Sequence, residues 1–189
     1  MSGMNLTSKY LFNEIPGDQK KIDEFGYKAC KLSLAKKWQF SLPDTVFLSG
    51  DLVKEIFEKK NVPAEILSHF KNKLLAIRPS PVIGRFTKNE PFIYIGLDDQ
   101  NYDALQQKVG VEKALEIYLN FLRMFALSIY NLDLENCDEL RRLLENSERS
   151  RTILGESGPN RISRIKQLIS LEKGSNFPKN VSEQLVDVI

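Results

Sequence analysis

Apolar residues recur at helical spacing in several long segments of the chain, with charged residues on the opposite positions. The clearest pattern covers residues 111–130, where an apolar residue returns every three or four positions, so we expect a core helix there. The same periodicity, with turn and capping residues at its ends, predicts further helices over 26–37, 63–74, 134–148, 160–173 and a short one within 178–189 that begins near Ser182. It also predicts a helix that Ser49 or Asp51 caps and that runs to about Lys60.

Four short apolar runs predict strands, at residues 9–12, 45–48, 74–77 and 92–97. The last two runs flank one long loop, so we expect them to form a hairpin-like pair. Strands therefore fall in the first half of the chain and helices fill the second. This order predicts an α+β fold, with a small mixed sheet and its helices in residues 1–100 and a helical subdomain in 101–189.

The composition is that of an ordinary globular protein. Of 189 residues, 42 % are hydrophobic and 28 % are charged, which is enough apolar material for a sizeable core. The net charge is only +2, so composition gives no reason to expect a nucleic-acid or membrane partner. The first residues show no leader pattern and no run of 18 uncharged apolar residues occurs, so we expect a cytoplasmic protein.

Cysteine and histidine are scarce. Cys30 and Cys137 lie far apart and form no CxxC pair, which disfavours a disulfide framework and a zinc site. His69 is the one histidine, which excludes a metal site that needs several. It falls in a predicted helix, where we expect it to be solvated or partly packed.

Positive charge gathers at three places, of which the first two are a predicted helix start and a predicted strand end. The first is Gly26-Tyr27-Lys28 at a predicted helix start, where free amides and a lysine can bind a phosphate; the alternative is a solvated lysine on a lysine-rich face. The second is Arg78, directly after an apolar strand. Its planar guanidinium suits phosphate oxygens, and an ion pair with a carboxylate is the alternative.

A third basic position is the loop from residue 79 to 91, which contains Gly84, Arg85, Thr87 and Lys88. A loop of this kind can fold over phosphates with its amides and cations. It is not a Walker A loop, because the GxxxxGK[ST] pattern is absent.

Acidic residues cluster in two places. Asp98-Asp99 precedes a predicted helix, so we expect these residues to begin that helix rather than to hold a metal. Glu139, near Arg141 and Arg142, is expected to be a charge on a helix surface.

Taken in order, these segments resemble the N-terminal part of pyruvate, phosphate dikinases. Residues 10–12 (YLF) and 26–32 (GYKACKL) resemble that family's opening strand and its Gly-Lys-Gly-Ala-x-Leu helix start. Residues 76–78 (AIR) resemble its Val-Arg-Ser-Gly segment, and 95–99 (IGLDD) its Leu-Gly-Leu-Asn-Asp segment. Residues 177–185 (FPKNVSEQL) resemble its Phe-Pro-x-x-x-x-x-Gln-Leu segment. The resemblance spans nearly the whole chain.

The resemblance implies the N-terminal half of an ATP-grasp-like domain. In the full enzyme, ATP, pyruvate and phosphate give phosphoenolpyruvate, with ATP and Mg²⁺ as cofactors. The resemblance further implies that the partners are the other ATP-grasp half, which supplies the acidic magnesium ligands after Ile189, and a phosphohistidine domain. The chain alone would bind ATP weakly or be inactive. The residues that would bind ATP are Lys28, Arg78, Gly84, Arg85, Thr87 and Lys88.

The loop departs from the family pattern, which leaves other functions open. Thr87 stands where the family has a glycine, and Pro91 has no amide hydrogen to donate. One alternative is therefore a non-catalytic binding or regulatory module derived from the same domain. Another is the corresponding half of a relative such as phosphoenolpyruvate synthase or an antibiotic phosphotransferase.

Overall fold

The computed structural model describes residues 10–12, 19–80, 91–145 and 158–189. The contacts divide this part of the chain into two compact units. The first contains the described residues up to His69, then 77–80, Pro91 and Ile189, and the second contains 70–76 and 92–188 without its gap. The predicted strand pair at 74–77 and 92–97, expected within the unit of residues 1–100, thus belongs mostly to the second unit.

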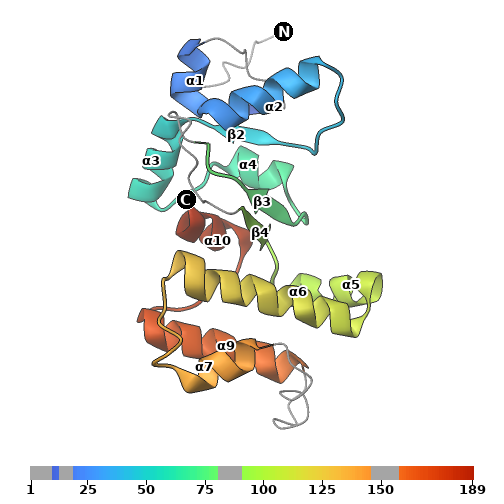
Figure 1. The fold of residues 1–189 in the computed structure, drawn as a ribbon, viewed down its shortest axis with the longest axis vertical. Coiled ribbons are helices and arrows are strands. Elements are labelled where there is room, and N and C mark those ends of the chain that lie inside the picture. The colour runs from blue at the N-terminus through green and yellow to red at the C-terminus, as the bar shows by residue number, and fades with distance from the viewer. Residues whose placement is uncertain (1–9, 13–18, 81–90, 146–157) are drawn as a thin grey trace. The chain divides into compact units, whose positions relative to one another are not determined.

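The first unit is a two-stranded antiparallel sheet with helices (Figure 1). In its register Tyr10 pairs with Leu48 and Phe12 pairs with Val46. A small core forms where Phe25 and neighbouring helix residues pack against Phe47 of the sheet. The elements are β1 (Tyr10–Phe12), α1 (Gln19–Phe25), α2 (Tyr27–Lys37), β2 (Val46–Leu48), α3 (Gly50–Lys59) and α4 (Ala64–His69).

Local capping explains where α3 begins. The hydroxyl of Ser49 accepts a hydrogen bond from the amide of Leu52 at 3.2 Å, which satisfies one of the free amides of the first turn. Leu52 and Ile56 are then buried on one face of the helix. The predicted helix start and its apolar face are confirmed here.

Helix α4 is shorter than the sequence predicted. It ends at His69, and the predicted apolar stripe beyond it does not continue in helical form. The amide of Lys73 donates to the carbonyl of Phe70 at 3.0 Å, and Asn72 between them has φ +61°. Asparagine tolerates the left-handed region better than most residues, so a tight turn forms where a third helical turn was expected.

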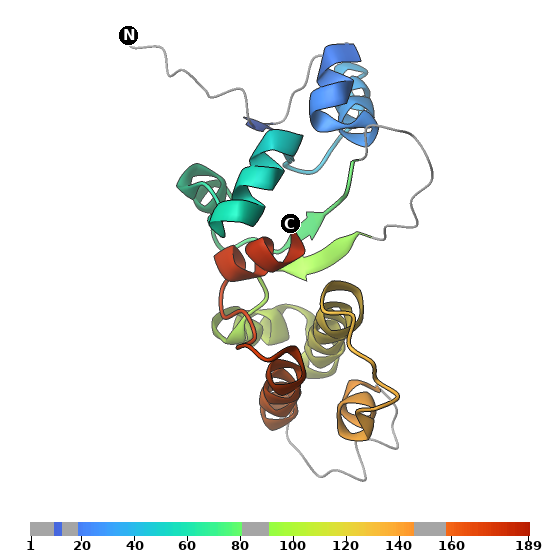
Figure 2. The same cartoon turned by 90° about the vertical axis from the view of Figure 1, so that its left-hand side faces the viewer.

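The second unit begins with a strand pair, and helices follow it. Strand β3 pairs with β4, which confirms the predicted pairing, and α10 lies beside β4 (Figure 2). The elements are β3 (Leu75–Ile77, whose last residue counts with the first unit), β4 (Phe92–Ile95), α5 (Asp99–Val109), α6 (Val111–Met124), the π-helical turn η1 (Phe125–Ile129), α7 (Asp138–Leu144), α9 (Gly158–Lys173) and α10 (Val181–Val188).

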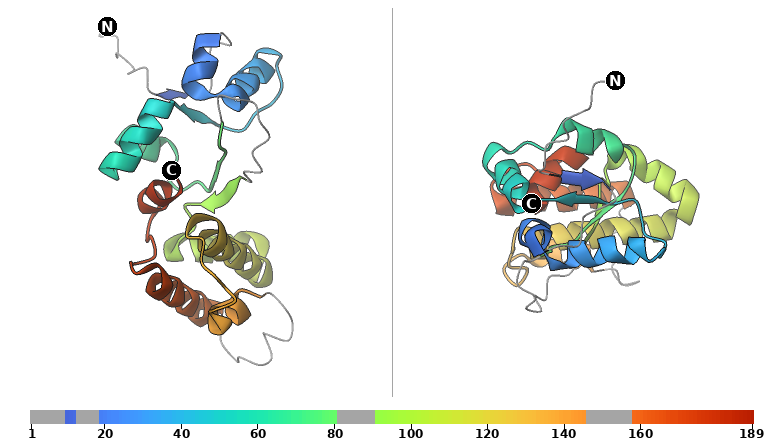
Figure 3. Two further views of the ribbon diagram at one scale, coloured as in Figure 1. Left: turned by 60° about the vertical axis from the view of Figure 1, so that its left-hand side comes forward. Right: turned by 90° about the horizontal axis from the view of Figure 1, so that it is seen from above.

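Helix α6 forms the centre of this unit, with α7 and α9 alongside it (Figure 3). Tyr118 and Phe121 are fully buried, with their rings edge to face at 5.8 Å between centroids. Phe177, from the segment before α10, joins the same aromatic cluster at 6.1 Å from Phe121. Each such side chain contributes about 1.5–3 kcal/mol by burial. The predicted core helix is confirmed in type and position.

Its last turn is different from the prediction. Residues 125–129 form a π-helix instead of continuing the α-helix to Tyr130, and the amide of Tyr130 donates to the carbonyl of Phe125 at 2.9 Å. The wider turn takes up one extra residue and so rotates the residues after it about the helix axis. Tyr130 then reaches Asp187 of α10 with its hydroxyl, a contact that local periodicity cannot foresee.

Helix α7 begins at Asp138, four residues after the predicted start at Leu134. The carboxylate of Asp133 accepts from the amide of Glu135 at 2.9 Å and from the side chain of Asn136 at 2.7 Å. Such a local turn competes with helix formation. The helix gives way to extended backbone at Glu145, and the predicted continuation to 148 lies outside the described residues.

The fold class is α+β, as predicted in its coarse form. Helix α9 begins at Gly158, two residues before the predicted start, and most of the predicted joint at 155–158 lies outside the described residues. Over the described part of the chain, none of the helices has the length and apolar composition needed to cross a bilayer.

Candidate phosphate-binding site

A glycine separates the first two helices. The amide of Gly26 donates to the carbonyl of Ile22 at 2.8 Å, at the end of α1. The Gly26 backbone then takes φ 79° and ψ 163°, and α2 begins at the next residue. This backbone conformation is open almost only to glycine. Gly26 therefore occupies the N-cap position of α2 without a side chain to cap it.

Ser80 supplies the missing cap. Its hydroxyl accepts a hydrogen bond from the amide of Ala29 at 2.9 Å. The backbone of Ser80 also approaches Gly26 so closely that a Cβ there would lie 1.6 Å from the Ser80 carbonyl oxygen. The segment that leaves β3 is thus held against the start of α2.

This contact brings the segments of two predicted phosphate ligands together. Lys28 directly precedes Ala29, and Arg78 precedes Ser80 by two residues, which places the Cα atoms of Arg78 and Ser80 within about 7.6 Å. Both basic side chains are exposed. Neither forms an ion pair with a described carboxylate, so the ion pair considered for Arg78 is not seen among these residues.

The start of α2 also offers backbone donors. The amides of Tyr27 and Lys28 donate to no residue that the structure describes, whereas the next amide, that of Ala29, is taken by Ser80. Free amides and the positive end of the helix dipole favour an anion at such a place. The start of α2 thus combines two such amides with the exposed Lys28, and the segment of Arg78 is held against it through Ser80.

The remaining predicted ligands cannot be placed. Gly84, Arg85, Thr87 and Lys88 all lie in residues 81–90, outside the described part of the chain. Their proposed role in covering a phosphate stays a prediction.

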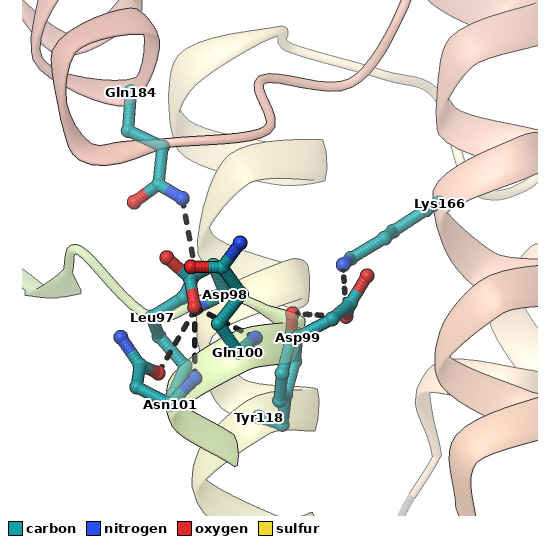
Figure 4. Close-up of polar contacts among 8 residues, drawn as sticks. All are labelled: Leu97, Asp98, Asp99, Gln100, Asn101, Tyr118, Lys166 and Gln184. Carbon is teal, nitrogen blue, oxygen red and sulfur yellow. Dashed lines mark hydrogen bonds and ion pairs between the residues drawn. The ribbon is translucent and has the colours of Figure 1, made fainter.

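The acidic pair that the sequence drew attention to has a structural role in the second unit. Figure 4 shows the carboxylate of Asp98 at the start of α5, where it accepts from the amides of Gln100 and Asn101 at 2.9 Å each. Asp99 accepts from the hydroxyl of Tyr118 at 3.1 Å and from Lys166 at 2.6 Å. The expectation that these residues begin a helix is confirmed.

Nothing in the sequence around Gln184 predicted that its side chain has a structural role. It is buried, and its side-chain oxygen accepts from the amide of Gly96 at 2.7 Å. Its side-chain nitrogen donates to the carbonyl of Leu97 at 3.0 Å (Figure 4). Both partners lie in the turn between β4 and α5. The sequence pointed to this contact only indirectly. Gln184 and its two partners lie in segments 177–185 and 95–99, which were noted for their resemblance to the dikinase pattern and not for a contact with each other.

A second polar cluster was also missed. Lys173 donates to the hydroxyl of Tyr130 at 2.9 Å and to the carboxylate of Asp187 at 2.8 Å, and Tyr130 donates to the same carboxylate. Burial, followed by the bond to Asp187, raises the pKa of Tyr130 well above its usual range. The tyrosine therefore stays protonated and fastens α10 to the end of η1.

Two other polar side chains have partners 25 positions away in the sequence. His69 contacts Asp44 at 2.9 Å and is partly exposed, in agreement with the expected partly packed histidine. Glu139 lies on the surface of α7, as expected, but its partner is Arg164 of α9, which donates to both of its carboxylate oxygens at 2.7 and 3.0 Å. These two hydrogen bonds hold the pKa of Glu139 below its usual range.

The described residues offer no ready metal site, because no group of three or more histidines, cysteines or carboxylates among them could hold an ion. An open hollow of about 420 Å³ lies in the second unit, where α5 meets α6, and is lined by residues 109–113 and Glu116. Its lining includes none of the predicted phosphate ligands.

Comparison with known proteins adds no relative to this picture. The chain matches none of the protein-family models and none of the curated proteins with which it was compared.

Proposed function

We propose that the first unit carries the phosphate-contacting part of a nucleotide site, as in the N-terminal ATP-grasp-like domain of a pyruvate, phosphate dikinase-like phosphotransferase. The observation that carries the proposal is the bond from Ala29 to Ser80. It joins the segment of Arg78 to the helix start that contains Lys28. The sequence predicted these two residues separately as phosphate ligands.

The donors in this region suit a nucleotide's phosphates. Lys28 supplies a compact positive charge, and Arg78 supplies a planar fork that can bind two oxygens at once. The amides of Tyr27 and Lys28, which donate to no described residue, add neutral donors at the positive end of a helix. Because both cations are exposed, water competes with the phosphate, so we expect weak binding by this half of the site alone.

The described residues do not fit a bound magnesium ion. Asp98 caps α5, and Asp99 binds Tyr118 and Lys166, so the acidic pair of the second unit is already engaged. We therefore assign the described chain a role in phosphate binding and derive no phosphoryl-transfer step from it.

The same observation supports the second candidate function, a non-catalytic binding or regulatory module derived from this domain. Such a module would keep the contact between Ser80 and Ala29 as a structural cap, with the carboxylates serving the fold. The two candidates differ in whether Lys28 and Arg78 contribute to nucleotide affinity.

Calorimetric titration with Mg-ATP and with adenosine tests the proposal. We expect measurable ATP binding and no adenosine binding. Arg78→Ala and Lys28→Ala should each weaken ATP binding by about tenfold or more, since a charge-assisted hydrogen bond contributes about 1.5–3 kcal/mol. Lys37→Ala is the matched control, because Lys37 is exposed at the opposite end of the same helix and should change the affinity little.

Equal effects of Arg78→Ala and Lys37→Ala would contradict the assigned contacts. A chain that binds neither Mg-ATP nor inorganic triphosphate at millimolar concentration would instead favour the second candidate. Circular dichroism of each variant separates lost binding from lost structure.

A further inference from the structure

The exposed face of α2 is both basic and apolar. Residues 27–43 contain four lysines and no acidic residue, although the whole chain has a net charge of only +2. The core side of the helix is formed by buried Ala29, Cys30 and Ser33. The apolar side chains on its other side therefore do not serve the core of this unit.

Helical geometry arranges the exposed residues in two rows. Tyr27, Lys31 and Trp38 are separated by four and seven residues, so they follow one line along the helix, and Lys31 lies over the Tyr27 ring at 4.7 Å. Leu32 and Lys36, four residues apart, form a second row roughly 140° further round the helix axis. Aromatic, aliphatic and basic side chains thus share the exposed half of the helix.

The end of the helix displays two aromatic side chains on a defined turn. The amide of Phe40 donates to the carbonyl of Ala35 at 3.1 Å, that of Gln39 donates to Lys36 at 2.9 Å, and Gln39 has φ +63°. These bonds make a Schellman turn, which fixes the backbone at Trp38 and Phe40. Trp38 is nevertheless 70 % exposed and Phe40 62 % exposed.

We propose that this surface, the basic-aromatic face of α2 (Tyr27, Lys31, Leu32, Lys36, Trp38 and Phe40), docks on an anionic phospholipid membrane. The lysines complement the negative headgroups, and their long stems let the charge stay in water while the apolar residues enter the interface. Tryptophan and other aromatic rings are well suited to the depth of the headgroups. The proposal does not depend on nucleotide binding by the same unit.

Charge and shape argue against other occupants. A second copy of this surface would bring lysines against lysines. The hollow beside Lys36, which Leu42, Pro43, Thr45 and Phe47 complete, holds only about 20 Å³, which is room for a water molecule and not for a peptide side chain. A convex helix face with protruding rings fits a broad, deformable anionic surface better.

Vesicle binding by the whole chain tests the proposal. Trp38 is the single tryptophan, so its fluorescence reports directly on the proposed surface. With vesicles of phosphatidylcholine and about one-third phosphatidylserine, we expect co-sedimentation and a blue shift of the Trp38 emission, both weakened by salt. Vesicles of phosphatidylcholine alone should bind at least about tenfold more weakly.

Variants locate the contact. Lys31→Glu with Lys36→Glu should lower partitioning about twentyfold or more, since each lysine near the membrane contributes about fivefold. Phe40→Ser should reduce the blue shift and leave Trp38 as reporter. Lys71→Glu with Lys108→Glu changes the net charge equally at exposed positions of the second unit and should have a much smaller effect.

Three outcomes would overturn the proposal. One is no binding to the anionic vesicles even at low salt. Another is equal loss of binding in the two double variants, which would show a general effect of net charge. The third is an unshifted Trp38 emission together with quenching by a single-stranded oligonucleotide, which would identify this face as a nucleic-acid surface.

Discussion

Gly26 and Ser80 lie so close together that one added methyl group at Gly26 would lie 1.6 Å from the carbonyl oxygen of Ser80. This contact accompanies the bond from Ala29 to the Ser80 hydroxyl. It is the link by which Arg78 and Lys28 come to the same region of the first unit. A conformational requirement at one glycine therefore supports the described part of the candidate site.

Gly26→Ala should destabilise the protein much more than Gly110→Ala. Both glycines occupy N-cap positions with nearly the same backbone angles, φ 79° and 86°, so both changes impose a similar backbone strain of about 1–3 kcal/mol. A Cβ at Gly110 would meet nothing within 4 Å, whereas one at Gly26 would collide with Ser80. We expect an additional cost of about 2 kcal/mol at Gly26, measured by urea unfolding. Equal costs would show that Ser80 is not held there.

Arg161→Met should cost about 2–4 kcal/mol of unfolding free energy. The guanidinium of Arg161 is buried and donates to the carbonyls of Leu143 and Glu145, where α7 ends. Methionine fills similar space but leaves these carbonyls without that donor. Arg142→Met, at an exposed position of α7, is the control and should change stability by less than about 0.5 kcal/mol. A small effect at Arg161 would mean that water replaces the side chain.

Gln184→Leu should destabilise the second unit by about 2–4 kcal/mol, because it leaves the buried amide of Gly96 and the carbonyl of Leu97 without their side-chain partner. Hydrogen exchange at the Gly96 amide should rise at the same time. The matched control is Gln107→Leu at an exposed position of α5. Unchanged exchange at Gly96 would contradict the assigned bond.

Tyr130 should make stability depend on pH on the alkaline side. Burial and the bond to Asp187 raise the pKa of Tyr130 in the folded chain, whereas an unfolded tyrosine ionises near pH 10. The stabilisation is therefore complete below about pH 10 and is lost as the pH rises beyond it, since only the unfolded state releases the proton easily.

Tyr130→Phe should consequently flatten part of the loss of unfolding free energy as the pH rises above about 10. Tyr27→Phe, at an exposed position, serves as the control. Tyr118, whose pKa burial and Asp99 also raise, remains in both variants, so the dependence should decrease without vanishing. Identical pH profiles for Tyr130→Phe and the unchanged protein would contradict this role of Tyr130.

The sequence by itself determined most elements and several of their ends. The helix at 111–124 follows from apolar periodicity, and the starts of α3 and α5 follow from Ser49 and Asp98. These features are readable because periodicity and capping act between residues a few positions apart. Lys28 and Arg78 were also recognisable as separate candidates, because each follows a local pattern, a helix start or a strand end.

Only the tertiary structure decided how distant segments meet. The cap of α2 comes from Ser80, the turn after β4 is bound by Gln184, and the π-helical end of α6 presents Tyr130 to Asp187. Each of these bonds joins residues more than fifty positions apart. A hydrogen-bond partner at that distance is selected by the packing of whole elements, which sets the position of each side chain after the local patterns have already been satisfied.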